Sequence, residues 1–336
     1  MPLDIKVAMT KTRIREWVKE YGTDGVYVSF SGGKDSTVLL HIVRELYPNI
    51  EAVFIDTGLE FPEIREFVKT FSNVTIIRPK MRFDEVIKKY GYPIISKDVA
   101  QTIYYGRKRT EYGLKKIYGF KTNGEPSPFR KRYVKYAPLL NVDFNVSNRC
   151  CIEMKEKPIR LKEKEKKPII ALLAEESNRR TDAWLKTGCN AFDSKRPLSK
   201  PMSFWTEQDV LQYIKQNSLP IASVYGDIVD ESQIIKSGGE IFEQQPMFEN
   251  CGGKLTTTGC KRTGCMFCGF GCHLEKESRW LLLKKTHPKQ YEYCIGGGEY
   301  NEEGIWQPNS KGLGLGHCFD VLNEIYGEGF IKYKEN

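Results

Sequence analysis

A buried strand, a glycine-rich turn and a helix follow one another near the start of the chain. Val26–Phe30 alternates apolar and small residues, which is typical of a buried strand. Ser31–Ser36 reads Ser-Gly-Gly-Lys-Asp-Ser, and Thr37–Leu46 has apolar residues at helical spacing. Glycines let a backbone approach a ligand closely, and the N–H groups at a helix start attract anions. The stretch therefore predicts a site for phosphate or pyrophosphate.

The turn does not fit the Walker P-loop. Four residues do not separate its two glycines, and no Ser or Thr follows Lys34. Ser-Gly-Gly-x-Asp-Ser after a strand instead resembles the PP-loop of the ATP-pyrophosphatase and adenine-nucleotide α-hydrolase superfamily.

Strands and helices alternate after this turn. Glu51–Ile55, Val74–Ile77 and Pro168–Ala174 are expected strands, with helices between them. This order predicts an α/β fold with a doubly wound, mainly parallel sheet and helices on both faces. We expect a nucleotide-binding domain over residues 1–230, with a basic aromatic insertion at about 91–148. A cysteine-rich, mostly irregular or helical region is expected over residues 231–336.

Further motifs, in order along the chain, resemble the phosphoadenosine phosphosulfate (PAPS) reductase family over about Val26–Tyr225. After the PP-loop they are Asp56-Thr57-Gly58 with Phe61-Pro62-Glu63, then Glu176-Ser177 followed by Arg180, then Trp205-Thr206-Glu207 before Asp209-Val210 and Tyr213-Ile214. The resemblance implies an adenine nucleotide held by Ser29, Ser31, Gly32, Gly33, Lys34, Asp35, Ser36, Asp56, Thr57 and Arg180. It makes Lys34, Asp35 and Arg180 the candidate catalytic residues. Magnesium would be helped by Asp35 or Asp56, although a helix-capping role for Asp56 stays open.

Ten cysteines are many for a chain with no signal of secretion, so metal binding or redox chemistry is favoured over disulfides. In iron–sulfur members of the family, a Cys-Cys pair and a distant Cys-x-x-Cys hold a four-iron cluster. Cys150-Cys151 and Cys265-Met266-Phe267-Cys268 resemble those two halves, which implies a 4Fe-4S cluster. The alternative is a local zinc site on Cys260, Cys265, Cys268 and Cys272, with His273 adjacent and Cys251 upstream.

The reductases of the family end in a mobile Glu-Cys-Gly-x-His tail whose cysteine attacks the sulfate, and this sequence has no such tail. Cys318, in a glycine-rich loop, is the best-placed substitute by sequence position alone. The missing nucleophile favours the relatives that use ATP to adenylate a target oxygen and install sulfur.

The formal net charge of +9 is concentrated in Arg107–Lys135, where lysines and arginines alternate with tyrosines and phenylalanines. Such a mixture suits nucleic-acid backbones and stacked bases, but also a charged face over core tyrosines. RNA or a nucleobase is therefore a candidate substrate. No long apolar run or signal peptide is present, so we expect a cytoplasmic protein with no membrane partner.

The sequence as a whole predicts a PP-loop sulfurtransferase with an iron–sulfur cluster, which adenylates a substrate and inserts sulfur into it. A protein that donates sulfur or electrons is an expected partner. One alternative is a PAPS or adenylyl-sulfate reductase producing sulfite. The other is a nucleic-acid-binding module with structural zinc.

Overall fold

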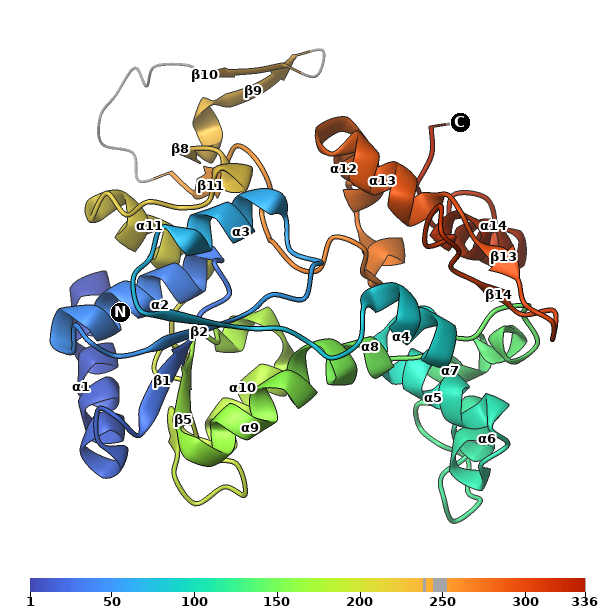
Figure 1. The fold of residues 1–336 in the computed structure, drawn as a ribbon, viewed down its shortest axis with the longest axis horizontal. Coiled ribbons are helices and arrows are strands. Elements are labelled where there is room, and N and C mark those ends of the chain that lie inside the picture. Colours follow the sequence, from blue (N-terminus) through green and yellow to red (C-terminus); the bar gives the residue numbers. More distant parts are fainter. Residues whose placement is uncertain (238–239, 244–252, 336) are drawn as a thin grey trace. The chain divides into compact units, whose positions relative to one another are not determined.

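The computed structural model describes residues 1–237, 240–243 and 253–335, so Cys251 lies outside the described residues. The chain forms two compact units, and each is assembled from separate stretches (Figure 1). Unit 1 comprises Met1–Asp56, Glu60–Arg78 and Pro158–Gly264. Unit 2 comprises Thr57–Leu59, Pro79–Lys157 and Cys265–Asn336.

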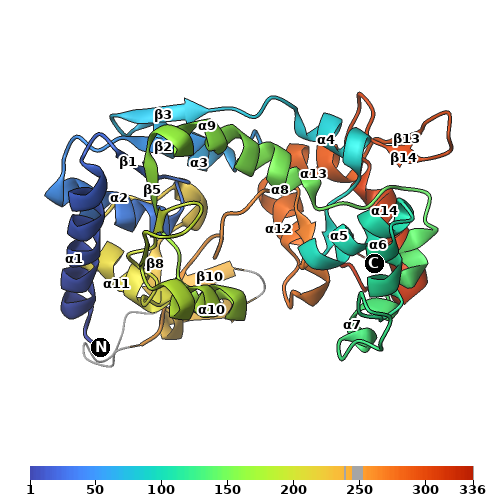
Figure 2. The ribbon, with the colours of Figure 1, turned by 90° about the horizontal axis from the view of Figure 1, so that it is seen from below.

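Unit 1 is built on a sheet with the strand order β3-β2-β1-β5-β7-β6, part of which is seen in Figure 2. All neighbouring strands are parallel except β6, which is antiparallel to β7. The strands are β1 (Val26–Ser29), β2 (Ala52–Ile55), β3 (Val74–Ile77), β5 (Lys167–Ile170), β6 (Asn190–Ala191) and β7 (Leu198–Ser199). The expected mainly parallel sheet is confirmed.

Alternating side chains of the strands enter two different cores. Val26 and Val28 of β1 belong to the large core of unit 1, which also includes apolar residues of α1, α2, α3 and α11. Tyr27 of β1 and Val53 of β2 belong to a small core with Ile159 of α9. Successive side chains of a strand point to opposite faces, so helices cover both faces of this sheet. The doubly wound arrangement is therefore also confirmed.

Two helices of unit 1 begin at side-chain caps. Ser177 accepts a hydrogen bond from the Arg180 N–H at the start of α10, and Thr206 forms a capping box with Asp209 at the start of α11. The helices are α1 (Leu3–Tyr21), α2 (Lys34–Leu46), α3 (Pro62–Lys69), α9 (Lys157–Glu165), α10 (Asn178–Thr187) and α11 (Glu207–Gln216), with short turns η3 (Ala174–Glu176), η4 (Ser223–Tyr225) and η5 (Glu231–Gln233). Two antiparallel pairs follow: β8 (Ile228–Asp230) with β11 (Leu255–Thr257), and β9 (Ile234–Ser237) with β10 (Glu240–Glu243).

Unit 2 is mostly helical. Its helices are α4 (Phe83–Tyr90), α5 (Lys97–Arg107), α6 (Glu111–Ile117), α7 (Arg130–Val134), α8 (Arg149–Cys151), α12 (Arg279–Thr286), α13 (Pro288–Ile295) and α14 (Leu315–Tyr326), with η1 (Ala137–Leu140), η2 (Ile152–Glu156) and η6 (Cys272–Leu274). Its strands are β4 (Ile94–Ile95), parallel to β12 (Gly269–Phe270), and β13 (Glu299–Tyr300), antiparallel to β14 (Trp306–Gln307). Trp280 and Phe319 are buried with ring centroids 5.1 Å apart, which joins α12 to α14.

The compact units divide the chain differently from a single boundary at residue 230. The backbone pairing of β4 with β12 joins the basic aromatic insertion to the cysteine-rich region in unit 2. The Tyr92 hydroxyl also donates to the Leu313 carbonyl at 2.8 Å, across more than two hundred residues of sequence. None of the described helices combines the length and the apolar character that a membrane crossing requires.

Candidate functional site

The PP-loop forms the turn between β1 and α2. Gly32 has φ +72°, and a Cβ built there would lie 2.8 Å from a methyl of Ile64 and 2.9 Å from a methyl of Val68. Only glycine fits this tight approach to α3. Ser36 closes the turn, because its hydroxyl accepts from the Ser31 N–H at 3.2 Å and donates to the Gly33 carbonyl at 2.9 Å. The start of α2 at Lys34 is thereby fixed beside the strand end.

This loop opens onto a cavity of about 400 Å³ that lies wholly within unit 1. Seven of the predicted nucleotide-binding residues line it, namely Ser29, Ser31, Gly33, Lys34, Asp35, Ser36 and Arg180. The cavity lies at the carboxyl ends of β1 and β5, where parallel sheets hold their ligands. The predicted anion site therefore brings residues from two separate parts of the chain around one space.

Three predicted site residues do not line this cavity. Gly32 turns toward α3, as described above. The Asp56 carboxylate is buried and lies 3.0 Å from the Arg65 guanidinium and 3.3 Å from that of Arg78. Thr57 belongs to unit 2. The roles of Asp56 and Thr57 toward a nucleotide or magnesium stay predictions.

Carboxylates accompany the cations of the cavity. The Lys34 ammonium lies 2.5 Å from Oε1 of Glu207, and Arg180 forms an ion pair with Glu176. Burial raises the pKa of the Asp35 carboxyl to about 6, since an ionised carboxylate there loses hydration. A phosphate that enters must exchange places with Glu207 as the partner of Lys34, whereas a metal ion would be favoured by the carboxylates.

Residues 261–264 line the same cavity and were not predicted as site residues. They supply Lys261, Arg262 and Thr263. Thr263 is held by the Tyr225 hydroxyl, 2.5 Å from its own, and the Tyr225 oxygen in turn accepts from the Lys34 N–H at 3.4 Å. The signal in the sequence is the basic pair Lys261-Arg262, which stands between Cys260 and Cys265.

The second candidate site lies in unit 2 and consists of cysteines. Cys150, Cys151, Cys265 and Cys268 all line one small cavity of about 30 Å³, together with Leu59, Phe83, Pro93, Met154 and Lys155. The two halves thus come together although 114 positions separate Cys151 from Cys265. The Cys265–Cys268 turn is fixed by the Met266 N–H, which donates to the Leu59 carbonyl at 2.8 Å, and by β12, which pairs with β4.

The four thiols influence one another. The hydrogen bond with Cys150, helped by the charges of Lys97 and Lys155, lowers the pKa of the Cys151 thiol to about 6 against the effect of burial. The same hydrogen bond, burial and the charges of Cys151, Cys268 and Cys265 raise the pKa of Cys150. Four cysteines with nearby cations, in an apolar pocket, form a donor set that fits an iron–sulfur cluster.

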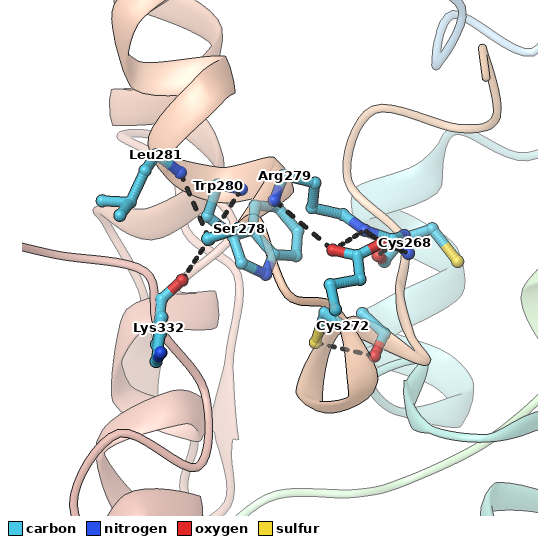
Figure 3. A network of polar contacts seen from close by, with 9 residues as sticks. Cys268, Cys272, Ser278, Arg279, Trp280, Leu281 and Lys332 are labelled. Carbon is cyan, nitrogen blue, oxygen red and sulfur yellow. Dashed lines mark hydrogen bonds and ion pairs between the residues drawn. The ribbon is translucent and has the colours of Figure 1, made fainter. Parts of the chain in front are cut away.

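An arginine supports the Cys268 end of this site (Figure 3). Arg279 donates from Nη1 to the Cys268 carbonyl at 2.9 Å, and Glu275 holds the same guanidinium by an ion pair. Cys272 faces a different partner, since its Sγ donates to the Gly269 carbonyl at 3.1 Å. Burial raises the pKa of Cys272 to about 11.

The alternative zinc set divides between the two units. Cys260 belongs to unit 1, whereas Cys265, Cys268 and Cys272 belong to unit 2, and Cys272 does not line the cysteine cavity. Over the described residues, no three His, Cys, Asp or Glu side chains converge as ligands of one metal ion. A four-iron cluster places each cysteine on a different iron, so its ligands need not converge on one point. The choice of metal stays a prediction.

The family model that matches the chain covers a segment with residues in both units. Residues 25–94 match the model of the phosphoadenosine phosphosulfate reductase domain. An uncharacterised protein of Methanocaldococcus jannaschii is 40% identical over 73 residues, which are 20% of this chain and 18% of the relative. An adenosine 5'-phosphosulfate reductase of Bacillus cereus is 35% identical over 79 residues, 22% of this chain and 33% of the relative. The chain thus spans a third or less of the length of these relatives.

A solved PAPS reductase of Candida auris, in complex with phosphate, aligns with 64% of this chain and 82% of its own at 15% identity, with a TM-score of 0.37. The predicted family resemblance is confirmed over the PP-loop, Asp56-Thr57-Gly58 and Phe61-Pro62-Glu63, all of which fall in the matched segment. Residues 25–94 are therefore similar to the phosphoadenosine phosphosulfate reductase domain.

Proposed function

We propose that this protein is an ATP-dependent sulfurtransferase that adenylates a carbonyl oxygen of its acceptor and replaces it with sulfur. The proposal rests on one observation. One cavity is lined by Cys150, Cys151, Cys265 and Cys268, and the same chain also has a PP-loop pocket. A nucleotide site and a sulfur-binding site in one protein suit activation by ATP followed by sulfur insertion.

The first step takes place in the cavity of unit 1. The acceptor oxygen attacks the α-phosphorus of ATP, the bond to the β-phosphate oxygen breaks, and pyrophosphate leaves. Lys34 and the amides at the start of α2 stabilise the negative charge on pyrophosphate, and Arg180 leaves Glu176 to bind the phosphates. Asp35 holds magnesium in its ionised form.

The second step exchanges oxygen for sulfur without net oxidation. Hydrosulfide, delivered by a sulfur-donor protein or as free sulfide, attacks the adenylated carbon. The carbon–oxygen bond then breaks, AMP departs with the oxygen, and a proton is released. A 4Fe-4S cluster would be held by Cys150, Cys151, Cys265 and Cys268, and its iron would take up sulfide only in exchange for one of these thiolates.

Sulfate reduction requires a cysteine that can reach the sulfate of a bound sulfonucleotide. Cys318 is fully buried in α14, and this burial raises the pKa of its thiol well above the ordinary value. Cys294 is equally buried in α13, with its pKa raised for the same reason. Neither late cysteine offers an accessible thiolate, which favours sulfur transfer over the reductase alternative.

The test uses full-length protein purified without oxygen and analysed for iron and sulfide. Pyrophosphate release is then measured with ATP, sulfide and a carbonyl-bearing nucleobase acceptor, either as a nucleoside or within RNA. We expect release that depends on the acceptor and is lost in Lys34→Ala. Sulfite formed from adenylyl sulfate, with no pyrophosphate released from ATP, would overturn the proposal in favour of the reductase.

A further inference from the structure

Most of the net positive charge of the chain lies in one segment of unit 2. The segment 97–149, here called the basic aromatic segment, has twelve lysines and arginines against four acidic residues. Its net charge of +8 is nearly all of the +9 that the whole chain carries. A charge bias this local points to a polyanionic partner rather than to general solubility.

The segment is a defined scaffold of three helices. Asp98 at the start of α5 accepts from Lys116 of α6 at 2.8 Å and from the Tyr133 hydroxyl of α7 at 2.6 Å. Burial alone would raise the pKa of Asp98, but these two bonds outweigh it and the pKa is lowered. The carboxylate is therefore ionised at neutral pH and joins the three helices. The surface that they carry is preorganised for a ligand.

Eight cations of the basic aromatic segment form no ion pair with any residue that the structure describes. Two of the eight have other polar partners, since Arg107 donates to the Val142 and Phe144 carbonyls and Lys97 lies by the Cys151 thiol, which leaves six. They are Lys108, Arg109, Arg130, Lys131, Lys135 and Arg149. All are exposed except Arg149, which is half-buried. By contrast, Lys115, Lys116 and Lys121 are paired with Glu111, Asp98 and Glu125. The unpaired cations are available to neutralise phosphates.

Aromatic rings stand among these cations with much of their surface in water. Phe129 is 62% exposed, Tyr118 is 48% and Tyr112 is 46%. The Arg130 guanidinium lies 5.7 Å from the ring centroid of Phe120, which is also exposed. Flat exposed rings between cations are the usual platform for unpaired bases.

We propose that the basic aromatic segment binds single-stranded RNA, whose phosphates contact the unpaired cations and whose bases stack on Phe129 and its neighbours. Double-stranded RNA would hide its base faces, so the exposed rings favour an unpaired strand or loop. An acidic protein would satisfy the cations but not the rings. This inference rests on the proposed function in one respect, since it identifies RNA as the carrier of the acceptor nucleobase.

The test measures binding of a fluorescein-labelled 20-nucleotide single-stranded RNA to full-length protein by anisotropy, over a series of salt concentrations. Phe129→Ala should weaken binding about tenfold at every salt concentration, since one stacking contact is lost. Arg130→Ala/Lys131→Ala should lower the slope of log affinity against log salt by about 1.4, because two phosphate contacts are lost. Circular dichroism checks that each variant stays folded.

The matched control is Lys186→Ala/Lys215→Ala, which removes the same charge from exposed positions of unit 1 that form no ion pair with a described residue. It should leave both the affinity and the slope unchanged. An equal loss in the control would show general charge attraction and overturn the proposal. So would a Phe129→Ala variant with full affinity, or equal competition by polyglutamate, which would identify an acidic protein as the partner.

Failure of this inference is distinguishable from failure of the proposed function. Pyrophosphate release with a free nucleoside, in a protein that does not bind the RNA, would overturn RNA binding alone. RNA binding that depends on Phe129, without pyrophosphate release from any acceptor, would overturn sulfur transfer alone. Lys34→Ala serves both measurements, because it should lose release while it keeps RNA affinity.

Discussion

The Lys34 ammonium lies 2.5 Å from Oε1 of Glu207, and Lys34 is buried while Glu207 is partly exposed. The cation that the PP-loop offers to a phosphate is thus already neutralised by α11. We expect Glu207→Gln to raise the affinity for pyrophosphate about fivefold, because about 1 kcal/mol of ion pairing no longer competes. Isothermal titration calorimetry with pyrophosphate measures the change. Lys34→Ala should abolish binding, and weaker binding by Glu207→Gln would mean that Glu207 itself holds the ligand, through magnesium.

Asp35 is expected to lower stability at neutral pH. Burial raises its folded-state pKa from 3.8 to about 6, so the unfolded chain ionises first as pH rises. Any stability from the protonated form is complete below about pH 4 and is lost as pH rises through 6. The shift corresponds to at most about 3 kcal/mol. Asp35→Asn should therefore raise the melting temperature at pH 7.5, with a gain that shrinks toward pH 4, while pyrophosphate release is lost. Asp24→Asn, at an exposed position, is the control, and a gain independent of pH would contradict the assignment.

Glu51, unlike Asp35, is expected to raise folding stability at neutral pH. Burial would raise its pKa, but Lys162 and Lys166, at 2.7 and 2.8 Å, and the Thr75 hydroxyl at 2.6 Å outweigh burial and lower it to about 2. The stability that the ionised Glu51 contributes is present above about pH 4.5 and is lost as pH falls through 2. After allowance for solvent screening, Glu51→Gln should cost about 1–2 kcal/mol at pH 7 and progressively less in acid, as measured by urea unfolding. Glu20→Gln, on an exposed part of α1, should change nothing at either pH.

Gly32→Ala combines backbone strain with a steric clash against α3. A left-handed backbone costs alanine about 1 kcal/mol of folding stability. The contacts of the new Cβ with Ile64 at 2.8 Å and Val68 at 2.9 Å should bring the total loss in the free energy of unfolding to about 2–3 kcal/mol. Gly22→Ala is the control, since Gly22 has φ +74° with nothing within 4 Å. Gly22→Ala should lose only the stability that corresponds to backbone strain. Equal losses in urea unfolding would show that the packing of the PP-loop against α3 is looser than the structure implies.

Cys268 and Cys272 provide a matched pair of substitutions for the metal. Cys268 lines the four-cysteine cavity and Cys272 does not. In protein purified without oxygen, Cys268→Ser should lose most of the bound iron and the brown absorbance, whereas Cys272→Ser should keep both. Elemental analysis separates the outcomes. Zinc that is lost from both variants would establish the local zinc site instead of the cluster.

The sheet and the PP-loop could be predicted because their signals are local. Alternation of apolar and small residues marks β1, a short apolar run marks β2, and the turn residues Ser31–Ser36 stand together in the sequence. The partner of Lys34 could not be predicted, because Glu207 is 173 residues away and no short-range pattern links them. The same holds for Lys261–Gly264, which enter the cavity only through the fold.

The helices of the basic aromatic segment could not be placed from the sequence, because its glycines interrupt the helical pattern. A Cβ on Gly113 would lie 2.4 Å from the Gly106 nitrogen. These glycines permit α5 and α6 to pack closely instead of breaking them. The caps Ser96 and Thr110, which accept from Val99 and Gly113 N–H groups, were the signal that could have found both helices.

The discontinuous units have a consequence for synthesis on the ribosome. Strands β3, β2 and β1 are complete once residue 78 has emerged, but β5, which pairs with β1, begins only at Lys167. At about 5–20 residues per second, the nascent chain carries an uncovered β1 edge for about 5–18 seconds. Unit 1 closes only after Gly264, and the Cys265–Cys268 turn leaves immediately afterwards. The last residues of the nucleotide pocket and the Cys265–Cys268 turn therefore leave the ribosome almost together.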